Sequence, residues 1–210
     1  MKKYFICSLL ASLIGVFNGH TQSSLTLSTI TNPPDFSKLS YAEADSAARV
    51  EEENISSGRK FSPEYLTNMV CQLQRGKLSN HNKVLCAWLI GELRPNDMNS
   101  VECLIENIEL EATNLDDVRL GLIRWGNYPA EEALCKVGKS AINPIFEHLR
   151  IETDNRRRNL MCRVLELTEG GKNVAENSGI AKGQLRDKIA VEKDPAKKAN
   201  LEAAMKELEE

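Results

Sequence analysis

A succession of short apolar stripes with helical spacing runs from residue 62 almost to the end of this 210-residue chain. Within each stripe, apolar residues recur three and four positions apart, which places them on one face of an α-helix. Glycine, proline or a polar capping residue separates one stripe from the next. No segment shows sustained alternation of polar and apolar residues, so strands are not expected. The chain is therefore predicted to be all-α.

The helix boundaries can be predicted from capping residues. Ser62 and Pro63 begin one helix, because serine is a good N-cap and proline suits the first helical position. Gly76 closes that helix, and Pro95 stops the one after it. Further stripes start at Val84, Met98, Leu115, Pro129, Ile142, Leu160, Ile180 and Leu201.

Four of the predicted helices share a common pattern. Each begins at a cap or turn residue, with a small or apolar residue seven positions later and an apolar anchor four positions after that. The anchors Ile90, Val137, Leu165 and Met205 are 47, 28 and 40 residues apart. Imperfect periods of this length, made of helix pairs, indicate an α-solenoid.

The segment Leu134-Cys135-Lys136-Val137-Gly138, followed by Ala141 and by Pro144-Ile145, resembles the junction between the two helices of bacterial HEAT-like repeats. The segments from Asp154 to Arg158 and from Asp194 to Leu201 are similar to the opening of a second repeat helix. This resemblance covers residues 62–208 and implies a right-handed α-α solenoid of about four irregular helix pairs with an N-terminal extension. Two features depart from it, an extra helix at Leu115–Trp125 and a loop from Gly170 to Gly179. The family function that it implies is mostly protein interaction.

Gly138-Lys139-Ser140 looks like the end of a phosphate-binding P-loop, but the sequence before it does not fit. A P-loop has a second glycine five residues earlier and follows a strand, whereas Ala133 stands there within a helical stripe. We therefore expect Gly138 to end one helix and Ser140 to cap the next. No nucleotide is expected.

The N-terminus has the layout of a signal peptide. Lys2 and Lys3 precede an apolar run from Tyr4 to Phe17, which is shorter than the roughly 20 residues of a membrane span. We predict a signal peptide at residues 1–21, a flexible linker with a possible short helix from Ser40 at 22–60, and a helical repeat domain at 61–210. Export to the periplasm or outside the cell follows, with no membrane association after signal removal. An uncleaved anchor is the alternative.

The net charge and the cysteine content limit the classes of partner and ligand that this chain is expected to bind. Removal of the two lysines of the leader changes the net charge from −3 to −5, whereas nucleic-acid-binding proteins carry a basic surface. No nucleic acid partner is expected. The five remaining cysteines lack the spacing of a metal site, so no metal is expected. We expect buried thiols, although one bridged pair remains open.

The polar cluster with most potential for binding is Arg156, Arg157, Arg158 and Arg163. Guanidinium groups can form charge-assisted hydrogen bonds with a carboxylate or phosphate of a partner. The alternative is that they neutralise Glu152 and Asp154 nearby or are solvated.

The histidines give no catalytic set, because His81 and His148 are both expected at the surface without a suitable partner. The sequence thus predicts an exported module that binds a protein partner, without catalysis or cofactor. A helical-repeat enzyme acting on a small envelope substrate is the alternative, and a structural envelope component tethered by its leader is a third.

Overall fold

The computed structural model describes residues 29–75, 77–112, 128–168 and 173–209. Within these ranges the chain is helical, and its only β-type pairing is an isolated bridge between Ile30 and Phe61. The all-α prediction is confirmed for this part of the chain. Its elements are η1 (Phe36–Lys38), α1 (Tyr41–Ser56), α2 (Pro63–Gln74), α3 (Asn80–Leu93), α4 (Met98–Glu106), α6 (Pro129–Val137), α7 (Lys139–Leu149), α8 (Asn155–Thr168), α9 (Val174–Val191) and α10 (Pro195–Glu207).

Local capping fixes where several helices begin. The Ser62 hydroxyl accepts the backbone N–H of Tyr65 at 3.3 Å, and Pro63 occupies the first turn of α2. Asp194 caps α10 in the same way by accepting the N–H of Ala196 at 2.9 Å. These caps satisfy N–H groups that the helix itself leaves without partners. The starts of α2 and α10 therefore agree with the sequence prediction.

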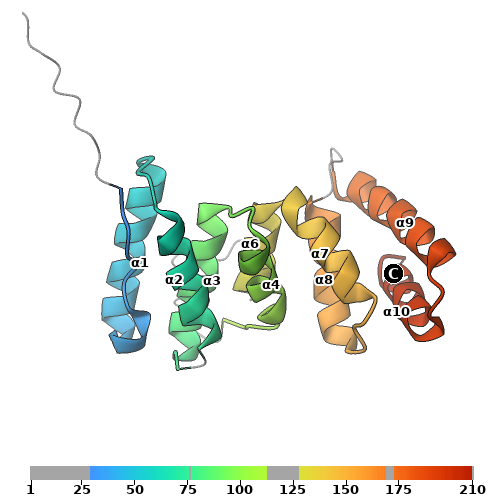
Figure 1. Cartoon of the computed structure of the whole chain (residues 1–210), viewed down its shortest axis with the longest axis horizontal. Coiled ribbons are helices and arrows are strands. Elements are labelled where there is room, and N and C mark those ends of the chain that lie inside the picture. The colour runs from blue at the N-terminus through green and yellow to red at the C-terminus, as the bar shows by residue number, and fades with distance from the viewer. Residues whose placement is uncertain (1–28, 76, 113–127, 169–172, 210) are drawn as a thin grey trace, which may run out of the picture.

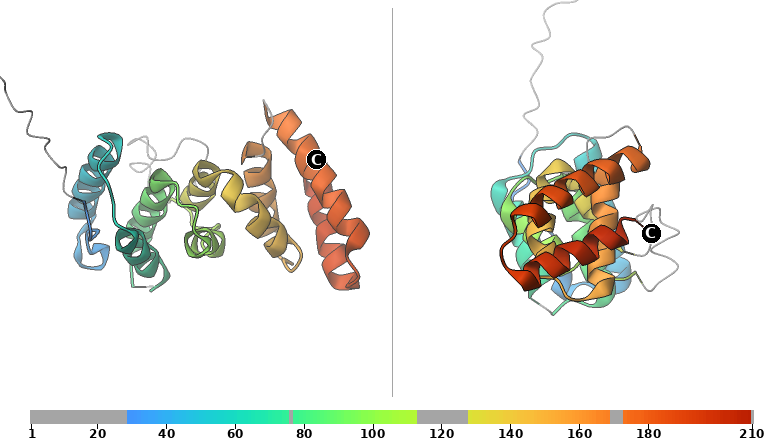
Figure 2. Two further views of the ribbon diagram at one scale, coloured as in Figure 1. Left: turned by 45° about the horizontal axis from the view of Figure 1, so that its top comes forward. Right: turned by 90° about the vertical axis from the view of Figure 1, so that its right-hand side faces the viewer.

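The helices pack in two layers along the long axis of the molecule. In one layer α1, α3, α6, α8 and α10 pack on one another in that order, and in the other α2 packs on α4 and α4 on α7. The layers meet where α2 packs on α3, α4 on α6 and α7 on α8, and α9 covers α8 and α10 at the C-terminal end. Figures 1 and 2 show this stacking from α1 at one end to α10 at the other. Each helix thus lies beside helices that are near it in the sequence.

The core between the layers is mainly aliphatic. Leu85, Leu89 and Ile90 of α3, Leu104 of α4 and Leu134 of α6 are fully buried. This agrees with an aromatic content of only 5%. Burial of such side chains drives the layers together, at about 1.5–3 kcal/mol for each Leu or Ile.

The closest approach between helices is at Gly91 of α3. A Cβ atom at this position would lie 2.6 Å from the Cα atom of Ala133 on α6, which is well inside van der Waals contact. Glycine therefore allows α3 and α6 to touch backbone to backbone. This contact sets the spacing in the middle of the first layer.

The four repeat anchors predicted from the sequence lie in one layer. Ile90, Val137, Leu165 and Met205 belong to α3, α6, α8 and α10, respectively. Ile90 and Leu165 are fully buried, and Val137 and Met205 are partly buried against the same core. The four segments therefore occupy corresponding positions in the stack.

Gly138 is the joint between α6 and α7, with a φ of +72° that favours glycine. The prediction of Gly138 as the end of a helix is confirmed. The prediction of Ser140 as the next N-cap is wrong, because α7 begins at Lys139 and Gly138 itself precedes it. Ser140 lies exposed within the first turn of α7.

Residues 29–39, expected to be flexible, form an extended strap across the first helices. Phe36 is fully buried. The Gln72 side chain of α2 accepts the N–H of Phe36 at 2.8 Å and donates to the carbonyl of Pro34 at 2.9 Å. The Asn82 side chain of α3 donates to the carbonyl of Phe36 at 2.7 Å. The packed part of the chain therefore extends N-terminal to the predicted boundary at residue 61.

The helix predicted at Ser40 begins at Tyr41 and continues for 16 residues. Glu43 accepts the backbone N–H of Ser40 at 2.9 Å, as in a capping box. Ala44 and Ala48 bury one face of α1 against α3. This helix is part of the folded domain.

Several predictions lie outside the described residues. They are the signal peptide at 1–21, the start of the linker at 22–28, the helix at Leu115–Trp125 and the glycine pair Gly170-Gly171. In the described ranges, no helix combines the length and apolar character that crossing a membrane requires.

Candidate functional site

The four arginines predicted to bind a partner lie on α8, and two of them contact the segment after α4. Arg156 donates to Glu111 at 3.0 Å and to the Tyr128 hydroxyl at 2.9 Å. Arg157 donates to Glu152 at 2.8 Å and to the carbonyl of Ile105 at 3.2 Å. The Arg157–Glu152 pair is the neutralisation considered as the alternative in the sequence.

The other two arginines connect α8 with α10 and α6. Arg158 is buried, contacts Asn155 and lies 4.0 Å from Glu207 of α10. Arg163 is 3.1 Å from the buried carboxylate of Glu131 on α6. All four guanidinium groups are thus engaged within the chain, and Arg156, at 52% side-chain exposure, is the most accessible.

A buried charge network lies on α6 where it meets α3 and α8. Lys136 bridges Glu132 of its own helix at 2.8 Å and Glu92 of α3 at 2.6 Å. Burial raises the pKa of Glu131 to about 7, an effect that the neighbouring Glu132 adds to and Arg163 opposes. Glu131 and Glu132 are buried by the packed helices, and their basic partners are partly exposed. The network is therefore better suited to holding helices together than to meeting a ligand.

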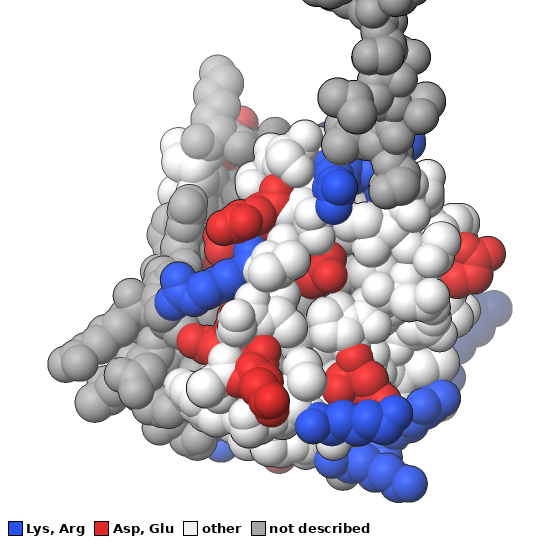
Figure 3. All heavy atoms as spheres, turned by 90° about the vertical axis from the view of Figure 1, so that its left-hand side faces the viewer, with Lys and Arg blue, Asp and Glu red and all other residues white. Residues whose placement is uncertain are grey.

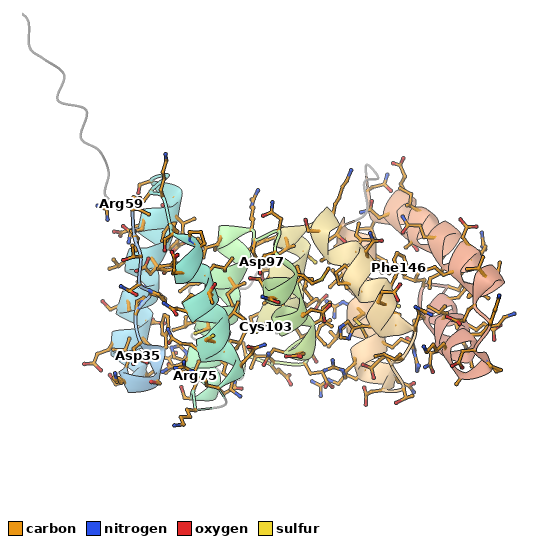
Figure 4. The ribbon with its side chains drawn as sticks, in the orientation of Figure 1. Asp35, Arg59, Arg75, Asp97, Cys103 and Phe146 are labelled. Atoms are coloured by element: carbon orange, nitrogen blue, oxygen red, sulfur yellow. The ribbon has the colours of Figure 1, made fainter. Side chains whose placement is uncertain are left out.

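A groove with a volume of about 460 Å³ lies between α2 and α4. The sequence did not reveal it. Leu66, Val70 and Cys71 of α2 form its apolar side, and Ser100, Glu102 and the cap residue Asp97 line it from α4. Figure 4 shows Asp97 at the start of α4 and Cys103 further along the same helix, beside α2. The volume lies within the roughly 300–1,000 Å³ of ligand pockets.

The polar side of this groove is acidic. Asp97 accepts the backbone N–H of Ser100 at 2.9 Å and its hydroxyl at 2.8 Å. Glu102 lies 2.6 Å from Nε2 of His148 on α7. Residues 63–74 and 97–106 contain no lysine or arginine. The absence of basic residues from both helices indicates the charge of this surface in the sequence, but the groove itself forms only where α2 packs beside α4.

The structure changes the interpretation of both histidines. His81 is buried and stacks on Tyr41 with a centroid distance of 3.7 Å, so its prediction as a surface residue is wrong. It packs there because α1 lies against α3. His148 is only partly exposed and is held by the carboxylate of Glu102.

The cysteines of the described chain act as packing residues. Cys71, Cys86, Cys103, Cys135 and Cys162 are all free, and Cys86, Cys103 and Cys162 are buried. The expectation of buried thiols is thus met by these three, whereas Cys71 and Cys135 are partly buried, and none of the five is bridged. Burial raises the pKa of Cys103 to about 12, so this thiol is protonated and a poor nucleophile at neutral pH.

No group of three or more His, Cys, Asp or Glu side chains in the described ranges is arranged to hold a metal ion. The groove instead offers an apolar surface with carboxylates beside it. Such an arrangement can bind apolar side chains and positive charge together.

No protein-family model, no characterised protein and no solved structure matches this chain. The groove and the arrangement of the helices are therefore the features that indicate a function.

Proposed function

We propose that this chain is an exported protein-interaction module that binds a partner protein through the outer surface of its stacked helices. Its described helices would form a right-handed, HEAT-like α-solenoid of about four irregular pairs, α2–α3, α4–α6, α7–α8 and α9–α10, with α1 and the strap as an N-terminal extension. The packing of each helix against its sequence neighbours supports this arrangement. So does the position of the four repeat anchors in one layer.

The observation that carries the proposal is the α2–α4 groove. It leaves Leu66 and the edge of Val70 facing a hollow of about 460 Å³ on the outside of the stack. Hollows with an apolar floor at the surface of a soluble domain commonly mark binding sites. The groove is formed by two first helices of consecutive pairs, so it is a product of the stacking itself.

The groove is a better candidate than the predicted arginine patch. Arg157 and Arg158 are largely covered and already face carboxylates of the chain. A partner would have to displace those contacts, and breaking a partly buried ion pair is costly. Arg156 has the most exposed guanidinium of the four, which would suit an additional contact at the edge of an interface.

Export is the part of the proposal that rests on the sequence of residues 1–21, namely Lys2 and Lys3 followed by the apolar run. Mass determination of the protein recovered from its native cells tests this part alone. A mature chain starting near Gln22 supports export with cleavage. A full-length chain in the cell interior would contradict it.

Affinity capture with a blocked groove tests the proposed interaction. Thr67 is exposed and lines the groove, so Thr67→Trp would fill the hollow without disturbing the core. Ala199→Trp, at an exposed position of α10, is the matched control. We expect a partner that is retained by the wild-type chain and by Ala199→Trp but lost by Thr67→Trp. Equal capture by all three proteins, or no specific capture by any, would contradict the proposal.

A further inference from the structure

We infer that the α2–α4 groove takes a cationic amphipathic segment of the partner protein, with an apolar side chain on the groove floor and lysine or arginine beside the α4 carboxylates. This inference rests on the proposed interaction function and specifies the chemistry of the partner.

Charge asymmetry is the first argument. The chain as a whole is nearly balanced, with 27 basic and 30 acidic residues. The described lining of the groove contains two carboxylates, Asp97 and Glu102, both from the α4 side, and no lysine or arginine. Two negative charges without a basic residue in the lining disfavour an acidic partner and attract a basic one.

A second hollow, between α7 and the end of α9, shows the contrast. There Arg150 lies 2.5 Å from Glu147 and 2.7 Å from Glu192, and Lys188 lies 3.5 Å from Glu147. Both carboxylates of that hollow are therefore paired with basic residues of the chain, and Lys193 adds a further positive charge to its lining. At the end of the molecule formed by α1, basic and acidic side chains are likewise both present, in small separate groups (Figure 3).

Asp97 can accept a further hydrogen bond from a basic partner, whereas Glu102 already lies 2.6 Å from Nε2 of His148. Asp97 accepts hydrogen bonds from the N–H and hydroxyl of Ser100, which are both uncharged. Its negative charge is thus held in place by the cap without being neutralised. A carboxylate has about four lone-pair sites, so it can also accept from a lysine or arginine.

The spacing of the carboxylates suits a helical partner. Asp97 and Glu102 are five residues apart, which corresponds to about 7.5 Å along the axis of α4. Basic residues four positions apart lie on one face of a partner helix and about 6 Å apart along its axis, which is a similar spacing. Between them, an apolar side chain of the partner can reach Leu66 and Val70 on the opposite wall.

Short fluorescent peptides provide the test by anisotropy titration of the whole chain. The first peptide alternates leucine and lysine with helical spacing, the second has glutamate in place of lysine, and the third has serine in place of leucine. We expect the leucine–lysine peptide to bind, with an affinity that falls as salt is added. The other two peptides should bind at least about tenfold more weakly, because each lacks one of the two contributions.

Charge-neutralising variants locate the binding. Asp97→Asn retains a good N-cap while removing the charge, and Glu102→Gln retains a hydrogen-bonding oxygen beside His148. The double variant should bind the leucine–lysine peptide about tenfold more weakly at low ionic strength, because it loses the contributions of two charges at the edge of the groove. Glu202→Gln, at an exposed position of α10, is the control and should leave affinity unchanged. Thermal unfolding of each variant verifies that the fold is retained.

Three results would overturn the inference. The first is equal binding of the lysine and glutamate peptides, and the second is unchanged affinity in the double variant with its fold intact. Preferential binding of small organic amines, with no gain from the rest of the peptide, would also overturn it in favour of a small-molecule site. None of these results affects the capture experiment with Thr67→Trp, so a protein partner of different chemistry would still be recognised.

Discussion

Substitution of Gly91 by alanine tests the contact on which the spacing of the helices depends. A Cβ atom at position 91 would lie 2.6 Å from the Cα atom and 2.7 Å from the Cβ atom of Ala133. Carbon atoms pack at about 3.5–4.0 Å, so α3 and α6 would have to move apart by about 1 Å. Because the nearest atom belongs to the backbone, no side-chain rotation can relieve this contact.

The size of the effect follows from two opposing contributions. Overpacking of this kind costs about 1–3 kcal/mol, and the close backbone contact places Gly91→Ala at the upper end of that range. Replacing glycine by alanine within a helix also stabilises it by about 1 kcal/mol. We therefore expect Gly91→Ala to lower the free energy of unfolding by about 1–2 kcal/mol.

Gly183 of α9 is the matched control, because a Cβ atom added there would meet no described heavy atom within 4 Å. Gly183→Ala should raise the free energy of unfolding by about 0.5–1 kcal/mol. Urea denaturation followed by circular dichroism at the helix band measures both variants. If Gly91→Ala proves as stable as Gly183→Ala, α3 and α6 do not touch at this point and the proposed layer is wrong.

Three further predictions concern the strap, the arginines and the buried carboxylate. Phe36→Ala should lower the free energy of unfolding by about 3–5 kcal/mol, because this side chain is fully buried under the first helices. Arg157→Glu should lower it by about 1–2 kcal/mol, because it places a second negative charge beside Glu152. Glu131 has a pKa raised to about 7 from an ordinary 4.5, so its contribution to stability is complete below about pH 4.5 and is lost as the pH rises through about 7. Between about pH 5 and about pH 8, the free energy of unfolding of the wild-type chain should therefore fall by up to about 3 kcal/mol more than that of Glu131→Gln.

Each of these predictions has a control and a contradicting outcome. Phe36→Leu should recover most of the stability lost by Phe36→Ala, and a stable Phe36→Ala would mean that the strap is not anchored. Arg186 is exposed on α9, so Arg186→Glu serves as a control charge reversal that should change the free energy of unfolding little. If Arg157→Glu and Arg186→Glu lower the free energy of unfolding equally, Arg157 has no structural role. Glu202→Gln should keep the pH dependence of the wild-type chain. A Glu131→Gln variant with that same dependence would show that this carboxyl does not titrate in the folded state.

The helical fold was accessible to sequence reasoning because its causes are local. The stripe from Tyr65 to Leu73 and the cap at Ser62 are set by neighbours within a few residues, and so is the glycine at position 138. The equivalence of Ile90 and Leu165 also follows from a repeated local pattern. The N-cap of α7 was predicted at Ser140 instead of Gly138, because helix ends depend on backbone angles that composition does not define.

The strap and the groove depend on contacts between distant residues. Residues 29–39 look like a linker in composition, but Gln72 and Asn82 bind their backbone from 36 and 46 residues away. The arginines of α8 similarly find most of their carboxylates far away in the sequence, on α6, on α10 and in the segment after α4. No local pattern specifies such pairings, so the arginine patch was a reasonable prediction whose partners only the fold reveals.

Position-specific photo-crosslinking in the native cells tests the central claim, the binding of a partner protein in the α2–α4 groove, most directly. A photoreactive amino acid replaces Gln74, which lines the groove, or, in the control protein, the exposed Glu202 of α10. The account predicts an adduct from position 74 alone, with a crosslinked partner peptide that contains apolar residues beside lysine or arginine. An adduct from position 202 without one from position 74 would contradict the groove as the binding surface, and an acidic crosslinked peptide would contradict its proposed chemistry.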